Sequence, residues 1–373
     1  MIAWVLSLKM SHAISLDSVM NLPAMGIPVL NYSPESTWEF GAAAQAYFQL
    51  PNQEHTSILQ IDGTYSLRNQ WYVNAQGTIY FAANGRTPWH LQFRAGYSDR
   101  PATYYGSYCD EHFANEGNTA IGMLRKGTPY EQQRAYCHIQ APIYLGKNVA
   151  LGPVADLLLV RFDIRNIYTT TDPLLQVGLG VVAQYDSRDN VFYPSRGVLA
   201  KVTASAAWIN KMDIQAGQQA TINGVLSTDV RQYIPLPCDL VLAWQWKTQL
   251  MLAPLPISHL TLYPLLPRLG GQDGIRGINS DMFRDDIMMA LQAELRIPIW
   301  SIFRAAVFAG IGDVYDYHNW HWTTPKIGYG IGLRATINKA KVNIRFDVAR
   351  SNIDPRWDNI NAYSFYLTAT EAF

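Results

Sequence analysis

The chain alternates between apolar and polar residues in segment after segment. In the first clear example, Trp89, Leu91 and Phe93 share one face, whereas His90 and Gln92 share the other. Successive residues of a β-strand point to opposite faces, so this period of two predicts strands with one apolar and one polar side. The repetition of the pattern along the chain indicates an all-β fold.

Sixteen segments fit this pattern, and the count is even. We expect strands at 27–33, 37–50, 56–69, 71–84, 89–100, 131–146, 149–167, 175–186, 197–209, 219–235, 239–254, 287–300, 303–317, 326–338, 342–351 and 362–373.

The polar faces indicate which environment these strands occupy. They carry mainly Gln, Gly, Asn and Thr with scattered Arg, rather than the Lys and Glu of a soluble surface. Aromatic residues such as Trp71, Trp89 and Trp300 stand near strand ends, where a membrane barrel has its interfacial girdles. The pattern therefore predicts a 16-stranded antiparallel transmembrane β-barrel. A soluble sandwich or propeller is the alternative, because all antiparallel folds alternate.

Composition narrows the class of protein. The 29 basic and 29 acidic residues cancel, and the resulting net charge of zero does not favour a nucleic-acid partner, which needs a clustered basic surface. An apolar fraction of 49% is too high for a disordered chain. Membrane-spanning helices are not expected either, because the sequence lacks apolar stretches of roughly 18–20 residues.

The domain organisation is simple. Residues 1–25 are either the remnant of a secretory signal or an ordinary N-terminal segment, and residues 26–373 form a single barrel. With both termini in the periplasm, the long connections at 101–130, 255–286 and 352–361 fall on the outer side.

Three sites carry a more specific signal. The first is a loop motif made of Gly270, Gly271, Ile275, Arg276 and Gly277. The second is a turn motif made of Asp186, Arg188, Asp189, Pro194 and Gly197. The third is the aromatic last residue, Phe373. Together they resemble the barrel domain of the outer-membrane assembly superfamily, which comprises the BamA and TamA relatives also called bacterial surface antigens.

The resemblance implies that the loop folds inward and that Arg276 meets carboxylates in the lumen. Strict alternation points Glu294 inward, so it is the expected first partner. The relatives' second acid falls at Gly310 here, which leaves Asp347 or Asp313 as candidates. A guanidinium in a low-dielectric lumen demands such partners. The alternative is a solvated loop arginine.

The other two motifs have structural interpretations. Asp and Ser side chains of the 186–189 turn are suited to accept bonds from turn amides, with Arg188 paired to a nearby acid. Phe373 resembles the terminal signal by which barrels are recognised for insertion, although Glu371 interrupts its apolar face.

Enzymatic and metal-dependent chemistry have little support. Cys109 and Cys137, with His112 and His138, contain soft-metal ligand types, but their spacing matches no known site, and a disulfide between the two cysteines is an equal alternative. Cys238 would be the remaining cysteine, outside that disulfide. The sequence has no Gly-x-Ser-x-Gly elbow and no phosphate-binding glycine loop with lysine. We therefore expect neither an enzyme nor a cofactor or metal.

The resemblance implies a protein of a Gram-negative outer membrane, in contact with its lipids, that assists insertion or translocation of proteins or lipids. Barely 25 residues precede the first strand, so we expect a separate periplasmic or outer-membrane partner to supply substrate binding. Pro28 in the first strand lacks an amide donor, which predicts a weak seam with the last strand. The alternatives are a scaffold barrel and a passive pore.

Overall fold

The computed structural model describes most of the predicted strands. The described residues are 24–33, 37–50, 56–81, 88–100, 102–105, 128–164, 168–169, 173–213, 217–252, 263–271, 274–280, 282–316, 325–336, 343–353 and 363–368. Residues 1–23, Cys109, His112, Glu371 and Phe373 lie outside them, so the expectations for the N-terminal segment and for the terminal signal remain predictions.

Sixteen long strands form the wall of the barrel. They are β1 (Ala24–Ser33), β2 (Thr37–Phe48), β3 (Ser57–Ser66), β4 (Trp71–Phe81), β5 (Trp89–Asp99), β7 (Thr128–Gln140), β9 (Val149–Ile164), β11 (Leu174–Asp186), β12 (Gly197–Asp213), β13 (Gly217–Pro235), β14 (Val241–Leu252), β15 (Ile287–Trp300), β16 (Phe303–Tyr315), β17 (Lys326–Thr336), β18 (Asn343–Ser351) and β19 (Tyr363–Thr368). Short strands β6 (Ala102–Tyr104), β8 (Ile143–Tyr144) and β10 (Tyr168–Thr169) extend this sheet, and η3 (Tyr263–Leu265) is a single 3₁₀ turn. In the described part of the chain, no helix has the length and apolar character needed to cross a membrane.

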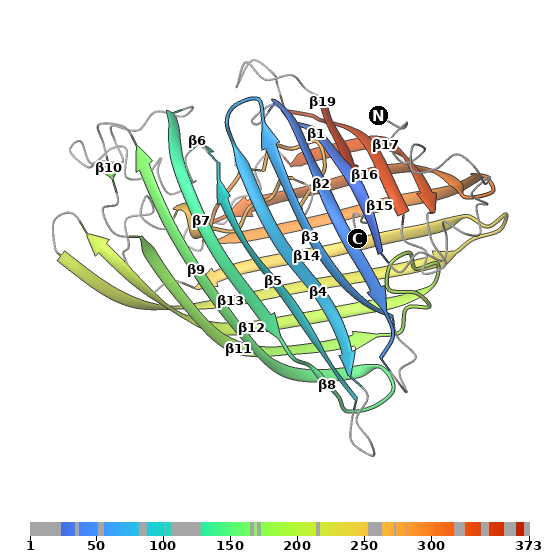
Figure 1. Cartoon of the computed structure of the whole chain (residues 1–373), viewed down its shortest axis with the longest axis horizontal. Helices are drawn as coiled ribbons and strands as arrows, with labels where there is room; N and C mark the ends of the chain where they lie inside the picture. Colours follow the sequence, from blue (N-terminus) through green and yellow to red (C-terminus); the bar gives the residue numbers. More distant parts are fainter. Residues whose placement is uncertain are drawn as a thin grey trace.

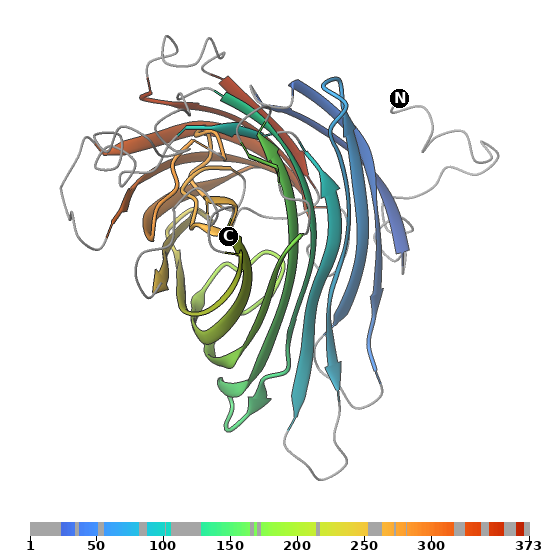
Figure 2. The same ribbon diagram turned by 90° about the vertical axis from the view of Figure 1, so that its left-hand side faces the viewer.

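Each wall strand pairs antiparallel with the next, and β1 pairs with β19 to close the barrel (Figures 1 and 2). The fold is thus the closed 16-stranded antiparallel barrel that the alternation predicts. The predicted strand 131–146 is divided into β7 and β8 at Ala141 and Pro142. Proline has no amide to donate to the ladder, so the regular pairing stops there.

The two faces of the wall are inverted relative to a soluble protein. Leu179 and Ile331 lie in mid-strand on the outer face, and 67% and 62% of their respective surfaces are exposed. Gln184, Asn223 and Gln245 are buried on the inner face. Apolar residues outside and polar residues inside are the arrangement of a barrel in lipid. The soluble sandwich or propeller alternative is therefore wrong.

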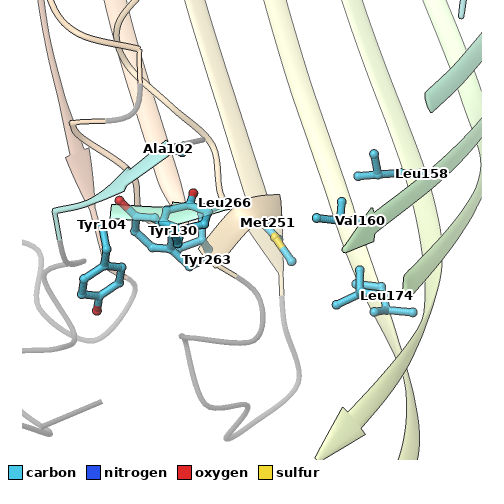
Figure 3. Close-up of a cluster of buried hydrophobic side chains, with 10 residues drawn as sticks. Ala102, Tyr104, Tyr130, Leu158, Val160, Leu174, Met251, Tyr263 and Leu266 are labelled. Carbon is cyan, nitrogen blue, oxygen red and sulfur yellow. The ribbon is translucent and has the colours of Figure 1, made fainter. Parts of the chain in front are cut away.

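The lumen has an apolar part at the end where the loop after β14 lies (Figure 3). Inward-facing Leu158, Val160 and Met251 from the wall form one cluster with Tyr130 and with Tyr263 of the loop after β14. The Tyr263 ring also lies 4.7 Å from that of Tyr104. These contacts hold the loop against the inside of the wall.

The rest of the lumen contains a polar cavity of about 1040 Å³. Its walls include Gln60, Asn74, Gln176, Lys201 and Ser205, so both amide and charged groups face it. Such a surface favours water over hydrocarbon.

We predict that Leu179→Arg destabilises the barrel in a bilayer by about 2–4 kcal/mol, because a guanidinium at mid-membrane depth must leave water. Gln176→Arg is the matched control, since it places the same group on the same strand but in the polar cavity. Denaturant unfolding of both variants in lipid vesicles measures the difference. Equal stability of the two would contradict the assignment of the faces.

Candidate functional site

The loop between β14 and β15 folds back on itself inside the barrel. Ile275 N donates to Leu269 O at 2.8 Å, and Gly271 N donates to Ile278 O at 3.0 Å. Leu269, Ile275 and Ile278 are buried and pack with Met288 and Val314 of the wall. In Figure 2 the orange loop lies within the ring of strands. The loop thus has an apolar base that fixes it to β15 and β16.

Glycines of β16 and β17 make room for the loop. A Cβ on Gly310 or Gly312 would lie 3.2 or 2.9 Å from methyl groups of Ile275. A Cβ on Gly328 would lie only 2.1 Å from the carbonyl oxygen of Arg276. Gly310, where the relatives' acid was expected, is therefore part of a surface without side chains on which the loop tip packs.

Arg276 is almost fully buried and binds two carboxylates. Its Nη2 lies 2.9 Å from Glu294 Oε2 on β15, and its Nη1 lies 2.8 Å from Asp347 Oδ2 on β18. Its Cζ also lies 3.5 Å from the ring centroid of Phe308. Asp313, the other candidate, pairs with Lys326. The structure thus places Arg276 between two acids and against an aromatic ring. Both the charge-assisted hydrogen bonds and the cation–π contact stabilise a buried guanidinium.

Three further arginines join this network. Arg334 on β17 donates to Glu294 Oε2 at 3.0 Å and to Asp347 Oδ1. Arg296 Nε donates to Glu294 Oε1 at 3.0 Å, and Arg345 Nε lies 3.4 Å from Asp347 Oδ2. All of these side chains are buried. Buried charges are stable only when paired in this way, so the network fixes the loop tip to three strands of the wall.

Gly277 connects the loop tip to the last strand. Its amide donates to the Tyr366 hydroxyl on β19 at 3.4 Å. Its φ of +91° is the left-handed region that favours glycine, and a Cβ there would lie 2.6 Å from Arg350 O. A residue with a side chain would therefore displace the tip from β18.

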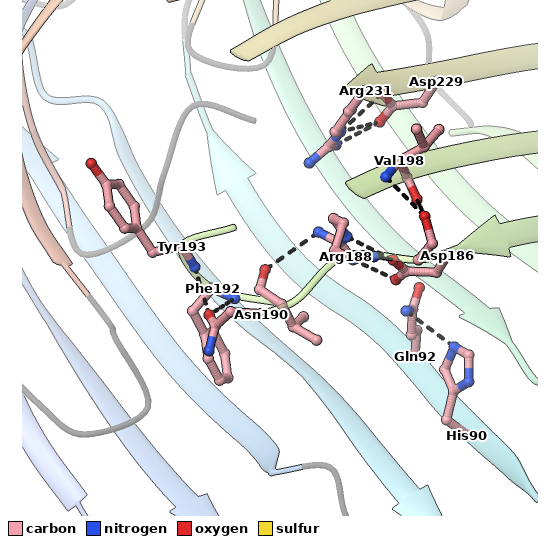
Figure 4. Close-up of polar contacts among 12 residues, drawn as sticks. His90, Gln92, Asp186, Arg188, Asn190, Phe192, Tyr193, Val198, Asp229 and Arg231 are labelled. Carbon is pink, nitrogen blue, oxygen red and sulfur yellow. Dashed lines mark hydrogen bonds and ion pairs between the residues drawn. The ribbon is translucent and has the colours of Figure 1, made fainter. Parts of the chain in front are cut away.

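The turn motif lies between β11 and β12 and is held by its own side chains (Figure 4). Asp186 accepts from Arg188 Nη2 at 2.7 Å, and Asn190 Oδ1 accepts from the amides of Phe192 and Tyr193, both at 2.8 Å. Asp189 Oδ1 accepts from Ser195 N at 2.9 Å. Carboxylates and an amide thus satisfy the donors that a turn leaves open.

The charge of Arg188 is maintained within this turn. Burial alone would lower its pKa, but the hydrogen bonds and the charge of Asp186 outweigh burial and raise the pKa above its usual value. The Asp186–Arg188 ion pair therefore helps to hold the shape of the turn.

The loop motif and the turn motif meet at Arg296. Its Nη1 donates to Pro194 O at 3.0 Å, and its Cζ lies 4.4 Å from the Tyr193 ring centroid. The same guanidinium binds Glu294, which binds Arg276. The two motifs that the sequence singled out thus belong to one network of contacts.

Sequence reasoning missed Arg296, Arg334, Arg345 and Tyr193. A signal was present, because Arg334 shares the polar face of an alternating strand with Gly330 and Gly332, and that face was predicted to point into the lumen. Which acids these arginines reach depends on the barrel's curvature, which the sequence does not show.

The structure also shows the state of two cysteines and of the candidate metal ligands. Cys137 and Cys238 are free cysteines. Cys109, the partner considered for a disulfide with Cys137, lies outside the described residues. Within the described residues, His, Cys, Asp and Glu side chains form no group of three that could hold a metal ion.

Comparison with known proteins gives the family and the fold. Residues 160–373 match the Omp85 superfamily domain. Among curated proteins, none matches this sequence at a significant level.

Solved structures resemble the whole barrel. The crystal structure of BamA from Haemophilus ducreyi lacking POTRA domains 1–3 has a TM-score of 0.58 and 14% identity, covering 94% of this chain and 70% of that one. CdiB from Acinetobacter baumannii has a TM-score of 0.57 and 12% identity, covering 92% of this chain and 59% of that one. CdiB from Escherichia coli has a TM-score of 0.54 and 11% identity, covering 93% and 62%. This chain therefore spans about three fifths of the CdiB chains, and the likeness concerns the fold.

We predict that Arg276→Ala lowers the free energy of unfolding by about 3 kcal/mol, because Glu294 and Asp347 each lose a buried partner. Arg276→Lys is the control; it keeps the charge but loses the fork that reaches both acids, so its loss is smaller. Heat-modifiable migration on gels and denaturant melting measure the effect. Identical melting of wild type and Arg276→Ala would count against the ion pairs.

We also predict that Gly328→Ala destabilises the barrel by about 1–3 kcal/mol, because its methyl group overlaps the Arg276 carbonyl. Gly146→Ala is the matched control, since nothing lies within 4 Å of a Cβ at that turn position. The same melting experiment applies. If both alanine variants melt together, the loop tip does not rest on β17.

Proposed function

This chain belongs to the Omp85 superfamily, and we propose that it inserts or translocates other outer-membrane proteins in the outer membrane of a Gram-negative bacterium. The route that we propose is the seam between the first and the last strand. The observation that carries this proposal is that, among the described residues, β1 pairs with β19 at three positions.

The two edges of β19 can be compared directly. All six of its described residues pair with β18, from Arg345↔Thr368 to Arg350↔Tyr363. Three of the same six pair with β1, namely those opposite Leu30, Asn31 and Tyr32, and the position opposite Tyr363 lies outside the described residues. Each missing pair removes backbone hydrogen bonds. Within the described residues, the seam is therefore the weaker edge of β19.

Side chains supplement the seam. Asn31 Oδ1 accepts from the amide of Leu367 at 3.3 Å, and the rings of Tyr32 and Phe365 are 5.9 Å apart. Such side-chain contacts are individually weak and can be exchanged for those of another strand. A substrate strand that pairs with an open edge would gain backbone hydrogen bonds, as in β-augmentation.

The lumen lies directly behind the seam. The polar cavity is lined by Val29 and Asn31 of β1 and by Tyr366 and Thr368 of β19. Tyr366 also accepts the amide of Gly277, so the loop tip contacts the last strand at the seam. An opened seam would thus join the membrane to a polar chamber.

The proposal includes a partner protein that delivers the substrate and contact with outer-membrane lipids. It does not include an enzymatic step or a cofactor. Purification from detergent-solubilised outer membrane, followed by identification of the co-purifying proteins, tests the partner.

We predict that Leu30→Cys with Leu367→Cys, which are directly opposite and on the outer face, forms a disulfide that blocks the function. Leu333→Cys with Phe346→Cys is the control, since it links β17 to β18 away from the seam. Both pairs are placed in a chain whose native cysteines are serine. The measurement is the level of outer-membrane proteins in the native host, which should fall only with the oxidised seam and recover on reduction.

Other outcomes distinguish the alternatives. Unchanged protein levels with the seam locked would refute the insertion route. A loss confined to outer-membrane lipids would make lipid the substrate. Steady conductance of the locked barrel in a planar bilayer would indicate a passive pore. A scaffold would be indicated if deletion of the protein caused an envelope defect that the locked barrel fully repaired.

A further inference from the structure

The turn between β11 and β12 leaves the wall and crosses the lumen. It spans residues 187–196 and is called the crossing turn below. Its Phe192 ring lies 6.0 Å from the ring of Tyr47 on β2, while Tyr193 contacts Arg296 on β15 and Arg304 on β16. In the closed sheet, five strands separate β2 from β11, and β13 and β14 separate β12 from β15. A short turn reaches such distant strands only through the opening that they enclose.

All of these wall residues lie at the same end of the barrel. Tyr47 stands one residue before the end of β2, and Arg304 is the second residue of β16. Tyr47, Arg296 and Arg304 are on the inner face by alternation with the exposed residues of their strands. The long connections after β5, β14 and β18 lie at the other end, which places this end in the periplasm in the membrane orientation argued above. The crossing turn thus lies in the periplasmic mouth.

The crossing turn is packed rather than solvated. Tyr193 and Pro194 are buried, and the Cζ atoms of Arg296 and Arg304 lie 4.4 and 5.8 Å from the Tyr193 ring centroid. Ordinary turns of this length extend into water. Figure 4 shows Phe192 and Tyr193 pointing away from β11 and β12, toward the opposite wall.

The shape of the turn is fixed in advance by its own side chains. Asn190 binds two of its amides, and Gly197 at its end has a φ of +106°. A Cβ on Gly197 would lie 2.4 Å from Ser187 O. The turn therefore presents its aromatic residues as one rigid body.

We propose that the crossing turn is a lid that closes the periplasmic mouth of the lumen, and that Arg296 latches this lid to the loop network. A polypeptide or solute that enters the cavity from the periplasm has to displace Phe192 and Tyr193. Since Arg296 binds both Pro194 and Glu294, release of the lid and release of the loop tip are coupled. The lid is independent of seam opening and does not require it.

The test measures entry into the cavity from the periplasmic side. Ser205→Cys, which lines the cavity on β12, is introduced into a chain whose native cysteines are serine. An affinity tag at Gly146, in the turn between β8 and β9, sorts lipid vesicles in which this side faces outward. The probe is a sulfonated maleimide dye added outside.

Removing the lid rings by Phe192→Ala with Tyr193→Ala should accelerate labelling about tenfold or more, because the ring contacts that favour the closed state are lost. Trp300→Ala with Phe303→Ala is the control, because it removes a stacked aromatic pair at the same end but on the exposed face, and labelling should not change. Heat-modifiable migration verifies that each variant is folded. Asn190→Ala, which only loosens the turn, replaces the double variant if that does not fold.

The latch has its own readout. Arg296→Gln leaves the rings in place but removes the guanidinium, and it should accelerate labelling to a similar extent. Unchanged labelling in the folded ring variant overturns the lid. Accelerated labelling in the ring variant with none in Arg296→Gln overturns the latch. Neither result depends on whether the locked seam blocks protein insertion.

Discussion

The structure depends on the pairing of one buried guanidinium with two buried carboxylates. Arg276 reaches Glu294 and Asp347 on different strands, and Arg334 binds the same two acids from a third. Charges removed from water are stable only when they are paired with opposite charges, because each unpaired ion has a large desolvation cost. The loop tip is therefore joined to the wall by buried ion pairs rather than by a strand ladder.

This arrangement needs space as well as charge. The inward positions of β16 and β17 opposite the loop are glycine at 310, 312 and 328, and a Cβ at any of them would meet the loop. A side chain at these positions would force the loop or the wall to shift, at a cost of about 1–3 kcal/mol. These glycines thus provide the space that lets the loop tip approach the wall and place Arg276 near its acids. Gly310 contributes space in this patch and takes no part in the ion pairs.

The resulting lumen has side chains packed at both of its ends. An apolar cluster around Tyr104, Tyr130 and Tyr263 occupies one end, and the crossing turn lies at the other end. The polar cavity lies between them and extends to the inner side of the seam. Contacts run from the crossing turn through Arg296 and Glu294 to Arg276, and then through Gly277 to Tyr366 on the last strand. Lid, loop and seam therefore share one chain of contacts.

The alternation along the chain was enough to predict the wall of strands. The pleat sends successive residues to opposite faces, so a period of two reveals each strand and which side chains share a face, including the inward position of Glu294. The turn chemistry of Asp186 and Asp189 was equally readable, because those bonds span only a few residues. Only the tertiary structure decided that Asp347 rather than Asp313 receives Arg276, and that the crossing turn points into the lumen. Those contacts join residues 71 and 102 positions apart, and they depend on how the closed sheet curves, which local pattern does not encode.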